Sequence, residues 1–239
     1  MFGVIFLGFL IGMQHAMEAD HVAAVASLAT RNRSVGETAR QGIAWGAGHA
    51  LTLFIFGGII VVMDTLVPQH FAQGLELAVG VMLVLLGVDV LQRLFRERIH
   101  FHQHRHGDSV HFHAHSHTSG LPHTEDSHQH QHPEKFPFRA LFVGMMHGMA
   151  GSAALIILAL NSVTSIGLGL LYIALFGIGS IFGMAMLAMV ISLPLRYSSR
   201  SFTWAHNGLK FAVGIITTGL GVRLIYEVGV IQGLLTGSS

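Results

Sequence analysis

The sequence has 239 residues, of which 51% are hydrophobic and only 10% are charged, and its formal net charge is +1. Soluble domains carry about 25% charged residues, so a mean hydropathy of +0.59 excludes a soluble globular protein and indicates a chain that crosses a lipid bilayer several times, with no nucleic-acid partner. The absence of cysteine excludes disulfides and thiolate metal ligands, which leaves histidine, carboxylate, thioether or backbone oxygen for any metal site.

Six apolar runs are long enough to cross the bilayer, because each membrane helix needs about 20 apolar residues. They lie at 2–29, 40–62, 73–93, 138–160, 166–193 and 208–230. We therefore predict an all-α integral membrane protein with six transmembrane helices. The first run lacks a basic leading region and has polar residues at its centre, so we expect it to stay in the mature protein rather than be cleaved as a signal.

The first run contains an unusual polar stretch, HAMEADH, from His15 to His21. An ionisable side chain at the bilayer centre costs about 2.5–3.5 kcal/mol, so such groups normally face a cavity, a partner or an ion. On a regular helix His15, Glu18 and His21 share one ridge. Asp20 points away from that ridge, and it can join the others only through a neighbouring helix or an unwound turn.

Two further histidines lie in other apolar runs, His49 in the second and His147 in the fourth. Neutral imidazole and carboxylate suit Ni²⁺, Co²⁺ and Zn²⁺. The predicted metal ligands are His15, Asp20, His21, His49 and His147, with Glu18 as an outer partner or proton acceptor. One alternative is a hydrogen-bonded knot without an ion, and another is a Cu(I) site that uses the methionines flanking His15 and His147.

The connection between the third and fourth runs, residues 94–137, is rich in histidine. Its proline, glycine and polar residues argue against a packed core, so we expect a disordered cytoplasmic loop. Such tracts bind several transition-metal ions loosely, although a plain solvated linker is the alternative. The auxiliary metal-binding candidates are His100, His102, His104, His106, His111, His113, His115 and His117.

Three segments of the first half recur in the same order in the second half. GMQHAM from Gly12 recurs as GMMHGM from Gly144, WGAGH from Trp45 as FGIGS from Phe176, and LAVGV from Leu77 as FAVGI from Phe211, at offsets of 132, 131 and 134. Each half, 1–93 and 138–239, holds three predicted spans. Because three is odd, the second half is expected to be inverted, which is a recurring transporter plan.

The basic residues separate by connection and predict the orientation. Twelve of the 13 lysines and arginines lie in or beside the connections between spans 1 and 2, 3 and 4, and 5 and 6. The positive-inside rule assigns these connections to the cytoplasm, so we predict a multi-pass protein of the cytoplasmic membrane with both termini outside. Near this side, Asp89 and Arg93 are spaced for an ion pair along one helix.

The motifs HAMEADH and WGAGHALT resemble those of the nickel/cobalt permease family, whose hallmark is a histidine, four residues and then Asp-His in a membrane helix. The stretch GMMHGMAGSAAL from Gly144 is most similar to the six-span branch associated with urease accessory functions. The resemblance implies that His15, Asp20 and His21 bind the transported ion. It also implies possible cytoplasmic partners, such as a metallochaperone or urease or hydrogenase maturation proteins. The chain departs from the eight-span importers in its six spans, in its external termini and in lacking the acidic motif that they carry in the second half.

The leading functional prediction is a secondary transporter of Ni²⁺ or Co²⁺, without enzymatic activity and without a prosthetic group. The chain has no nucleotide-binding GxxxxGK[ST] motif, and a membrane potential of 100 mV favours uptake of a divalent cation by about 4.6 kcal/mol. Three alternatives stay open. They are an exporter that collects metal on the loop and exchanges protons through Glu18 or Asp20, a non-transporting nickel-binding accessory protein, and an intramembrane metalloenzyme.

Overall fold

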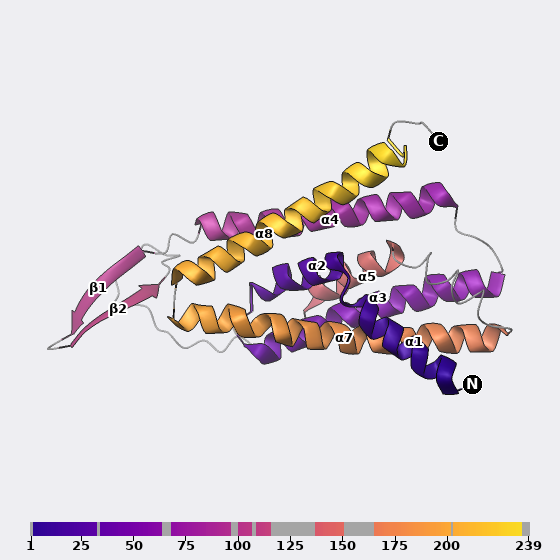
Figure 1. Ribbon diagram of the computed structural model, residues 1–239, viewed down its shortest axis with the longest axis horizontal. Coiled ribbons are helices and arrows are strands. Elements are labelled where there is room, and N and C mark those ends of the chain that lie inside the picture. Colours follow the sequence, from indigo (N-terminus) through magenta and orange to yellow (C-terminus); the bar gives the residue numbers. More distant parts are fainter. Residues whose placement is uncertain are drawn as a thin grey trace.

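The computed structural model describes residues 2–32, 34–63, 68–96, 100–106, 109–115, 137–150, 165–201 and 203–235. Helices form the apolar part of the chain, and a two-stranded hairpin lies between α4 and α5 (Figure 1). The helices are α1 (Phe2–His15), α2 (Ala19–Ala29), α3 (Val35–Met63), α4 (Gln69–Arg96), α5 (Phe138–Ala150), α7 (Ile166–Ser201) and α8 (Thr203–Tyr226), and a short π-helix, η1 (Glu227–Ile231), follows α8. The strands are β1 (His100–His106) and β2 (Ser109–His115).

Four of the helical segments in the described part of the chain are long and apolar enough to cross a membrane. They are α3, α4, most of α7, and α8 together with η1, and they confirm the second, third, fifth and sixth predicted runs as helices. The prediction of one helix over 2–29 is wrong, because the chain leaves helical geometry between His15 and Ala19. The fourth run begins as α5, and its remainder, 151–160, lies outside the described residues.

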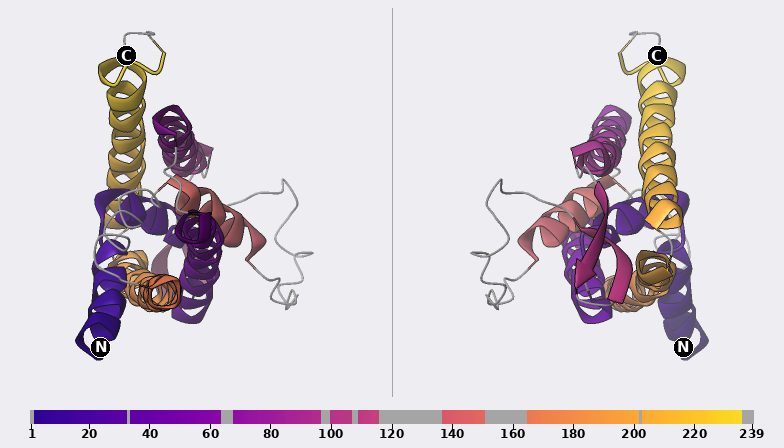
Figure 2. Two further views of the ribbon diagram at one scale, coloured as in Figure 1. Left: turned by 90° about the vertical axis from the view of Figure 1, so that its right-hand side faces the viewer. Right: turned by 90° about the vertical axis from the view of Figure 1, so that its left-hand side faces the viewer.

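The helices form two groups with α2 and α5 between them. Seen end-on, α4 and α8 lie on one side of these two short helices, and α1, α3 and α7 lie on the other (Figure 2). The long helices α3 and α7 pack along each other in opposite directions, and so do α4 and α8 (Figure 1). The first residues of α1 and the last of α8 lie at one end of the molecule, whereas the hairpin lies at the opposite end.

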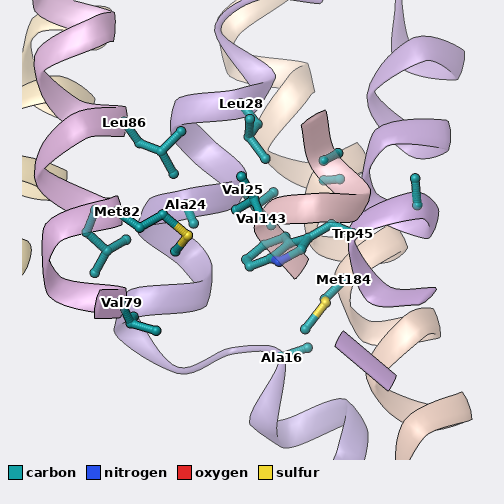
Figure 3. Packing of buried hydrophobic residues seen from close by; sticks show 14 residues of the cluster. Ala16, Ala24, Val25, Leu28, Trp45, Val79, Met82, Leu86, Val143 and Met184 are labelled. Atoms are coloured by element: carbon teal, nitrogen blue, oxygen red, sulfur yellow. The ribbon is translucent and has the colours of Figure 1, made fainter. Parts of the chain in front are cut away.

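The central apolar cluster surrounds α2. On one side of this helix Val25 and Leu28 lie near Trp45 of α3, and on the other side Ala24 faces the row formed by Val79, Met82 and Leu86 of α4 (Figure 3). Residues Ala23 to Ala29 are all buried. A helix that is apolar around its whole circumference is typically enclosed by protein, and α2 is therefore held in place by neighbours from both halves of the chain.

Glycines allow the closest helix crossings, and these contacts are reciprocal between the two halves. A Cβ atom on Gly12 of α1 would overlap the backbone oxygen of Phe176 in α7, and a Cβ atom on Gly144 of α5 would overlap the backbone oxygen of Trp45 in α3. The sequence repeat pairs Gly12 with Gly144 and Trp45 with Phe176. Each half thus inserts its first helix against the second helix of the other half.

A second pair of glycine contacts is also reciprocal between the two halves of the chain. Gly48 of α3 has no space for a Cβ atom beside the backbone of Leu141 in α5, and Gly179 of α7 has none beside the backbone of Phe9 in α1. Small residues permit such close backbone approach in membrane helices. The crossings α3 with α5 and α1 with α7 are therefore fixed by equivalent positions.

Substitution of Gly48 by alanine is expected to destabilise the protein by about 1–3 kcal/mol, because the added methyl group meets backbone that cannot rotate away. Gly74 is the matched control, since it is exposed in α4 and has no atom within 4 Å of a built Cβ. Its replacement by alanine should leave stability unchanged or raise it by about 0.5–1 kcal/mol through helix propensity. Thermal unfolding in detergent measures both variants. Equal melting temperatures would contradict the crossing described above.

An ion-pair cluster joins three segments at the hairpin end of the bundle. Asp89 of α4 accepts hydrogen bonds from Arg31, which follows α2. The distances from Nη2 of Arg31 to Oδ1 and Oδ2 of Asp89 are 2.7 and 2.5 Å. The predicted pair with Arg93 is confirmed at 3.1 Å, and Arg139 of α5 approaches to 3.5 Å. One carboxylate thus pairs with guanidinium groups from both halves of the chain.

Replacement of Asp89 by asparagine is expected to lower the unfolding free energy by on the order of 1 kcal/mol, because the three arginines keep their positions but lose their shared counter-charge. The effect should shrink as salt is raised, since added ions screen the arginines from one another. The exposed pair of Arg223 and Glu227, 3.9 Å apart, is the control. Glu227→Gln should change the melting temperature in detergent by much less, and an equal change would contradict the proposed role of the cluster.

The hairpin corrects the prediction of a wholly disordered loop. β1 and β2 pair antiparallel, with His100 opposite His115 and His106 opposite Ser109. The physical reason is visible in the sequence, because histidine at every second position has the period of a strand. Residues 116–136 lie outside the described part of the chain.

Candidate metal site

The break between α1 and α2 forms the centre of the site. The last turn of α1 tightens, since the Met17 and Glu18 amides donate to the carbonyls of Gln14 and His15. Glu18 has extended backbone geometry, φ −63° and ψ 149°, and α2 restarts at Ala19. Of the two ways in which Asp20 could join the histidine ridge, the structure therefore has the unwound turn, which redirects α2 relative to α1.

Asp20 lies between two imidazoles from different helices. Its Oδ1 atom accepts hydrogen bonds from the backbone N–H and the Nδ1 atom of His21, at 2.9 and 3.0 Å. Its Oδ2 atom lies 2.8 Å from Nε2 of His147 in α5. The carboxylate thus bridges the two halves of the chain and orients one histidine from each.

A second carboxylate, that of Glu18, orients His15. Its Oε1 atom lies 2.8 Å from Nδ1 of His15. The Glu18 side chain is 56% exposed, whereas that of Asp20 is 34% exposed. Glu18, which we predict to be an outer partner of the site, thus contacts the ring of His15.

Four buried histidines form one contiguous group. Their exposed fractions are 7% for His15, 1% for His21, 0% for His49 and 2% for His147. The ring of His21 is central, with centroids 4.5 Å from His15, 5.1 Å from His49 and 4.2 Å from His147. One ring nitrogen from each of His15, His21 and His49 lies within 4.8 Å of the other two, and a second such triplet joins Asp20, His21 and His147.

The hydrogen bonds decide which ring nitrogens are available to a metal. An ionised carboxylate can only accept, so the Nδ1 atoms of His15 and His21 carry the hydrogen and a neutral ring keeps its lone pair on Nε2. Both of these Nε2 atoms are buried and have no hydrogen-bond partner in the part of the chain that the structure describes, and the same holds for both ring nitrogens of His49. Carboxylates that fix the tautomer of a ligating histidine are a regular feature of protein metal sites.

The two triplets therefore differ in chemistry. In the triplet of His15, His21 and His49, each ring has a nitrogen to which no described group forms a hydrogen bond. In the triplet of Asp20, His21 and His147, both carboxylate oxygens already accept hydrogen bonds. The Nδ1 atom of His147 also lacks a hydrogen-bond partner among the described residues. Buried polar atoms without a partner are costly, and a group of such imidazoles fits a divalent ion of the Ni²⁺, Co²⁺ or Zn²⁺ class.

Aromatic rings line the histidine group at equivalent positions, and the sequence reasoning gave them no role. Trp45 stacks on His21 with ring centroids 5.6 Å apart, and Phe176 lies 5.2 Å from the ring of His15. Both side chains are buried. The sequence repeat could have identified both residues, because Trp45 opens the WGAGH segment and Phe176 opens its counterpart FGIGS.

The second half contributes less polar chemistry in the described residues. Ser180, at the position equivalent to His49, donates to the carbonyl of Gly12 at 3.2 Å and so helps to hold the end of α1. The position equivalent to Asp20, Ser152, lies outside the described residues. Among the loop candidates, the histidines from His100 to His115 belong to the hairpin, and His117 lies outside the described residues.

Comparison with known proteins assigns the chain to a family. It is 34% identical over 236 residues to the urease accessory protein UreH of Bacillus sp. (strain TB-90), with 98% of this chain and 95% of that protein aligned. It is 22% identical over 220 residues to the chloroplast protein FOR GROWTH AND FERTILITY 2 of Arabidopsis thaliana, and it spans about half of that protein's length. No established family profile and no solved structure matches the chain. The chain belongs to the family of UreH, which is of the nickel/cobalt permease type.

Proposed function

We propose that this protein is a secondary transporter that takes up Ni²⁺ or Co²⁺ across the cytoplasmic membrane. The observation that carries the proposal is the group of three buried imidazoles of His15, His21 and His49. Each brings one ring nitrogen within 4.8 Å of the other two, and each has a ring nitrogen without a hydrogen-bond partner among the described residues. Buried imidazoles without partners are unfavourable unless a ligand uses them. The family membership supports a nickel-type ion as that ligand.

In this proposal the primary ligands are His15, His21 and His49. Asp20 and Glu18 contribute in two ways, by fixing the tautomers of His21 and His15 and by adding negative charge that offsets the charge of a dehydrated cation. His147 is coupled to the ligands through Asp20, which it contacts at 2.8 Å. The site thus draws on both halves of the chain.

The proposed architecture is six spans in two inverted halves, 1–93 and 138–239. The reciprocal glycine crossings support it, because contacts between α1 and α7 have counterparts between α5 and α3 at positions related by the sequence repeat. The opposite directions of α3 and α7 also fit an inversion (Figure 1). An inverted pair can expose one central site alternately to the two sides of a membrane.

The proposed orientation has both termini outside and the hairpin in the cytoplasm. The first residues of α1 and the last of α8 share one end of the molecule, opposite the hairpin (Figure 1), and the Asp89 cluster with its three arginines lies toward the hairpin end. A negative interior then drives a divalent cation inward by about 4.6 kcal/mol per 100 mV. Arriving metal would meet the hairpin histidines and cytoplasmic partners such as a metallochaperone or urease or hydrogenase maturation proteins.

Accumulation of ⁶³Ni in cells that lack other nickel transporters tests the proposal. Expression of the protein is expected to raise cellular nickel, because inward movement follows the membrane potential. Membrane vesicles with an imposed potential serve as the control for indirect effects on metabolism. A fall in cellular nickel would overturn uptake in favour of export. Unchanged nickel in cells and vesicles, together with binding by the purified protein, would overturn transport in favour of an accessory role.

A further inference from the structure

One face of α3 continues the metal site toward the hairpin end of the molecule. Going from His49 of the site toward the start of the helix, Trp45, Gln41 and Thr38 follow at spacings of four, four and three residues. Residues at such spacings are neighbours on one side of a helix. α3 begins toward the end of the molecule at which α4 leads into the hairpin (Figure 1). The face that carries His49 therefore extends from the histidines to that end.

A recess lies along this face of α3. Its empty volume is about 170 Å³, and α2, α3 and α7 all contribute to its walls. Thr38 and Gln41 supply polar side chains, whereas Leu28 of α2 and Ala188 of α7 supply apolar ones. Gln41 also accepts a hydrogen bond from Asn32, which belongs to the connection between α2 and α3. The recess thus lies between the histidine-bearing part of α3 and the polar residues of that connection.

Trp45 contacts both the recess and the histidines. It is one of the residues that line the recess, and its ring stacks on that of His21 with centroids 5.6 Å apart and planes inclined by 26°. The ring of His147 lies 5.9 Å away. The Trp45 side chain is completely buried and lies near Val25 of α2 and Val143 of α5 (Figure 3). The indole therefore stands between the candidate ligands and the recess.

The indole is held by close packing from both halves of the chain. A Cβ atom on Gly144 of α5 would lie 2.3 Å from Cδ1 of Trp45, so the ring needs glycine at that position. The Nε1 atom of Trp45 has no hydrogen-bond partner among the described residues. A buried donor without a partner is costly, and this cost falls if the ring moves toward the recess and its N–H meets water. The unpaired donor thus lowers the free energy needed to displace the ring.

We propose that Trp45 is the gate between the metal site and the recess, and that displacement of its ring opens the route by which the ion leaves toward the hairpin side. This inference rests on the proposed transport function and adds the residue that closes one side of the site. Apolar constrictions can gate a pore by excluding water, and alternating access requires a closure on one side of a central site. Because an indole offers no lone pair to a metal, removal of Trp45 should change access to the histidines and leave the ligand set intact.

Cysteine labelling tests the gate without any measurement of transport. The chain has no cysteine, so His49→Cys places a single thiol in the site and Gln41→Cys places one in the recess. Gln41→Cys identifies the side of metal-free membrane vesicles from which a charged, membrane-impermeant thiol reagent enters the recess. From that side, Trp45→Ala is expected to raise the labelling rate of His49→Cys at least about 10-fold, because truncation of a buried ring leaves a cavity that its neighbours fill only in part. Labelling from the opposite side should stay unchanged.

Leu53→Ala is the matched control, since Leu53 is buried four residues beyond His49 in the opposite direction along α3. It should not speed labelling from the recess side, and Trp45→Phe, which keeps an aromatic ring, should leave labelling slow. Equal acceleration by Trp45→Ala and Leu53→Ala, or none by Trp45→Ala, would overturn the gate. Gln41→Cys that is labelled from neither side would overturn the recess as part of the route. Absence of nickel uptake by the parent protein would instead overturn the proposed function, and these labelling rates would not depend on it.

Discussion

His49→Leu is expected to weaken nickel binding by the purified protein at least about 100-fold and to abolish nickel uptake. His49 is completely buried, and neither of its ring nitrogens has a hydrogen-bond partner among the residues described by the structure. Leucine has similar bulk but offers no lone pair, so the change deletes one ligand of the triplet with His15 and His21. Isothermal titration with Ni²⁺ measures the affinity, and ⁶³Ni accumulation measures transport.

The same variant separates a metal site from a knot of hydrogen-bonded side chains. Because the His49 ring has no hydrogen-bond partner among the described residues, a knot would gain stability when an apolar side chain replaces this unsatisfied ring. We therefore expect metal-free His49→Leu to melt at or above the temperature of the parent protein, while nickel no longer raises its melting temperature. His70→Leu, at an exposed position near the start of α4, is the matched control and should retain the nickel shift. Full nickel affinity in His49→Leu would remove His49 from the site.

Hydropathy predicted the long helices well but not where they end. The run at 40–62 corresponds to α3, yet that helix begins at Val35, because Ser34 accepts a hydrogen bond from the Glu37 amide and starts the helix among polar residues. The run at 166–193 corresponds to α7, which continues past Pro194 to Ser201. Apolar content locates the part of a helix that lipid surrounds, whereas local hydrogen bonds determine its ends.

The candidate site was predictable in composition but not in geometry. The cost of polar residues in an apolar run singled out His15, Asp20 and His21, and the structure brings them together with His49 and His147. The position of Asp20 between His21 and His147 depends on the break before α2 and on the packing of α5 from the other half. Both are tertiary features that the period of one helix cannot supply. The rings of Trp45 and Phe176 belong to the site for the same reason.

The prediction of disorder for the hairpin was wrong because it depended on composition and did not use the alternation of residues along the chain. Glycine and polar residues suggested disorder, but the alternation of histidine from His100 to His106 and again from His111 to His115 is a strand pattern. Histidine is seldom counted as a strand residue, since strand predictions usually depend on β-branched and aromatic side chains. In this segment the two-residue period of histidine predicts strands better than the strand propensity of histidine does.

Asp20→Asn is expected to reduce nickel affinity at least about 100-fold and to eliminate uptake, while the protein still inserts and folds. Asparagine has the shape of aspartate, and its amide oxygen can accept the two hydrogen bonds that His21 donates to Oδ1 at 2.9 and 3.0 Å. The His21 ring therefore keeps its orientation and its free Nε2 atom. The change removes one negative charge beside the imidazoles, where low dielectric makes attraction between a carboxylate and a divalent cation strong.

The amide also changes the second contact of residue 20. Its NH₂ group would face Nε2 of His147, which Asp20 holds at 2.8 Å, so the His147 ring must exchange its tautomer and place its hydrogen on Nδ1. The variant thus keeps the geometry around His21 and alters charge and His147 together. The double variant Asp20→Asn/His147→Leu separates these effects. If lost charge is the cause, its nickel affinity should equal that of Asp20→Asn, whereas recovery of affinity would assign the defect to His147.

Asp89→Asn is the matched control for Asp20→Asn, because it removes one carboxylate from the cluster with Arg31, Arg93 and Arg139, away from the histidines. It should bind nickel like the parent despite its lower stability. Insertion of the Asp20 variant should be no worse than that of the parent, since a neutral side chain crosses hydrocarbon at lower cost than a charged one. Parental ⁶³Ni uptake by Asp20→Asn would mean that a cation passes these imidazoles without the Asp20 charge, and the proposed role of that carboxylate would be wrong.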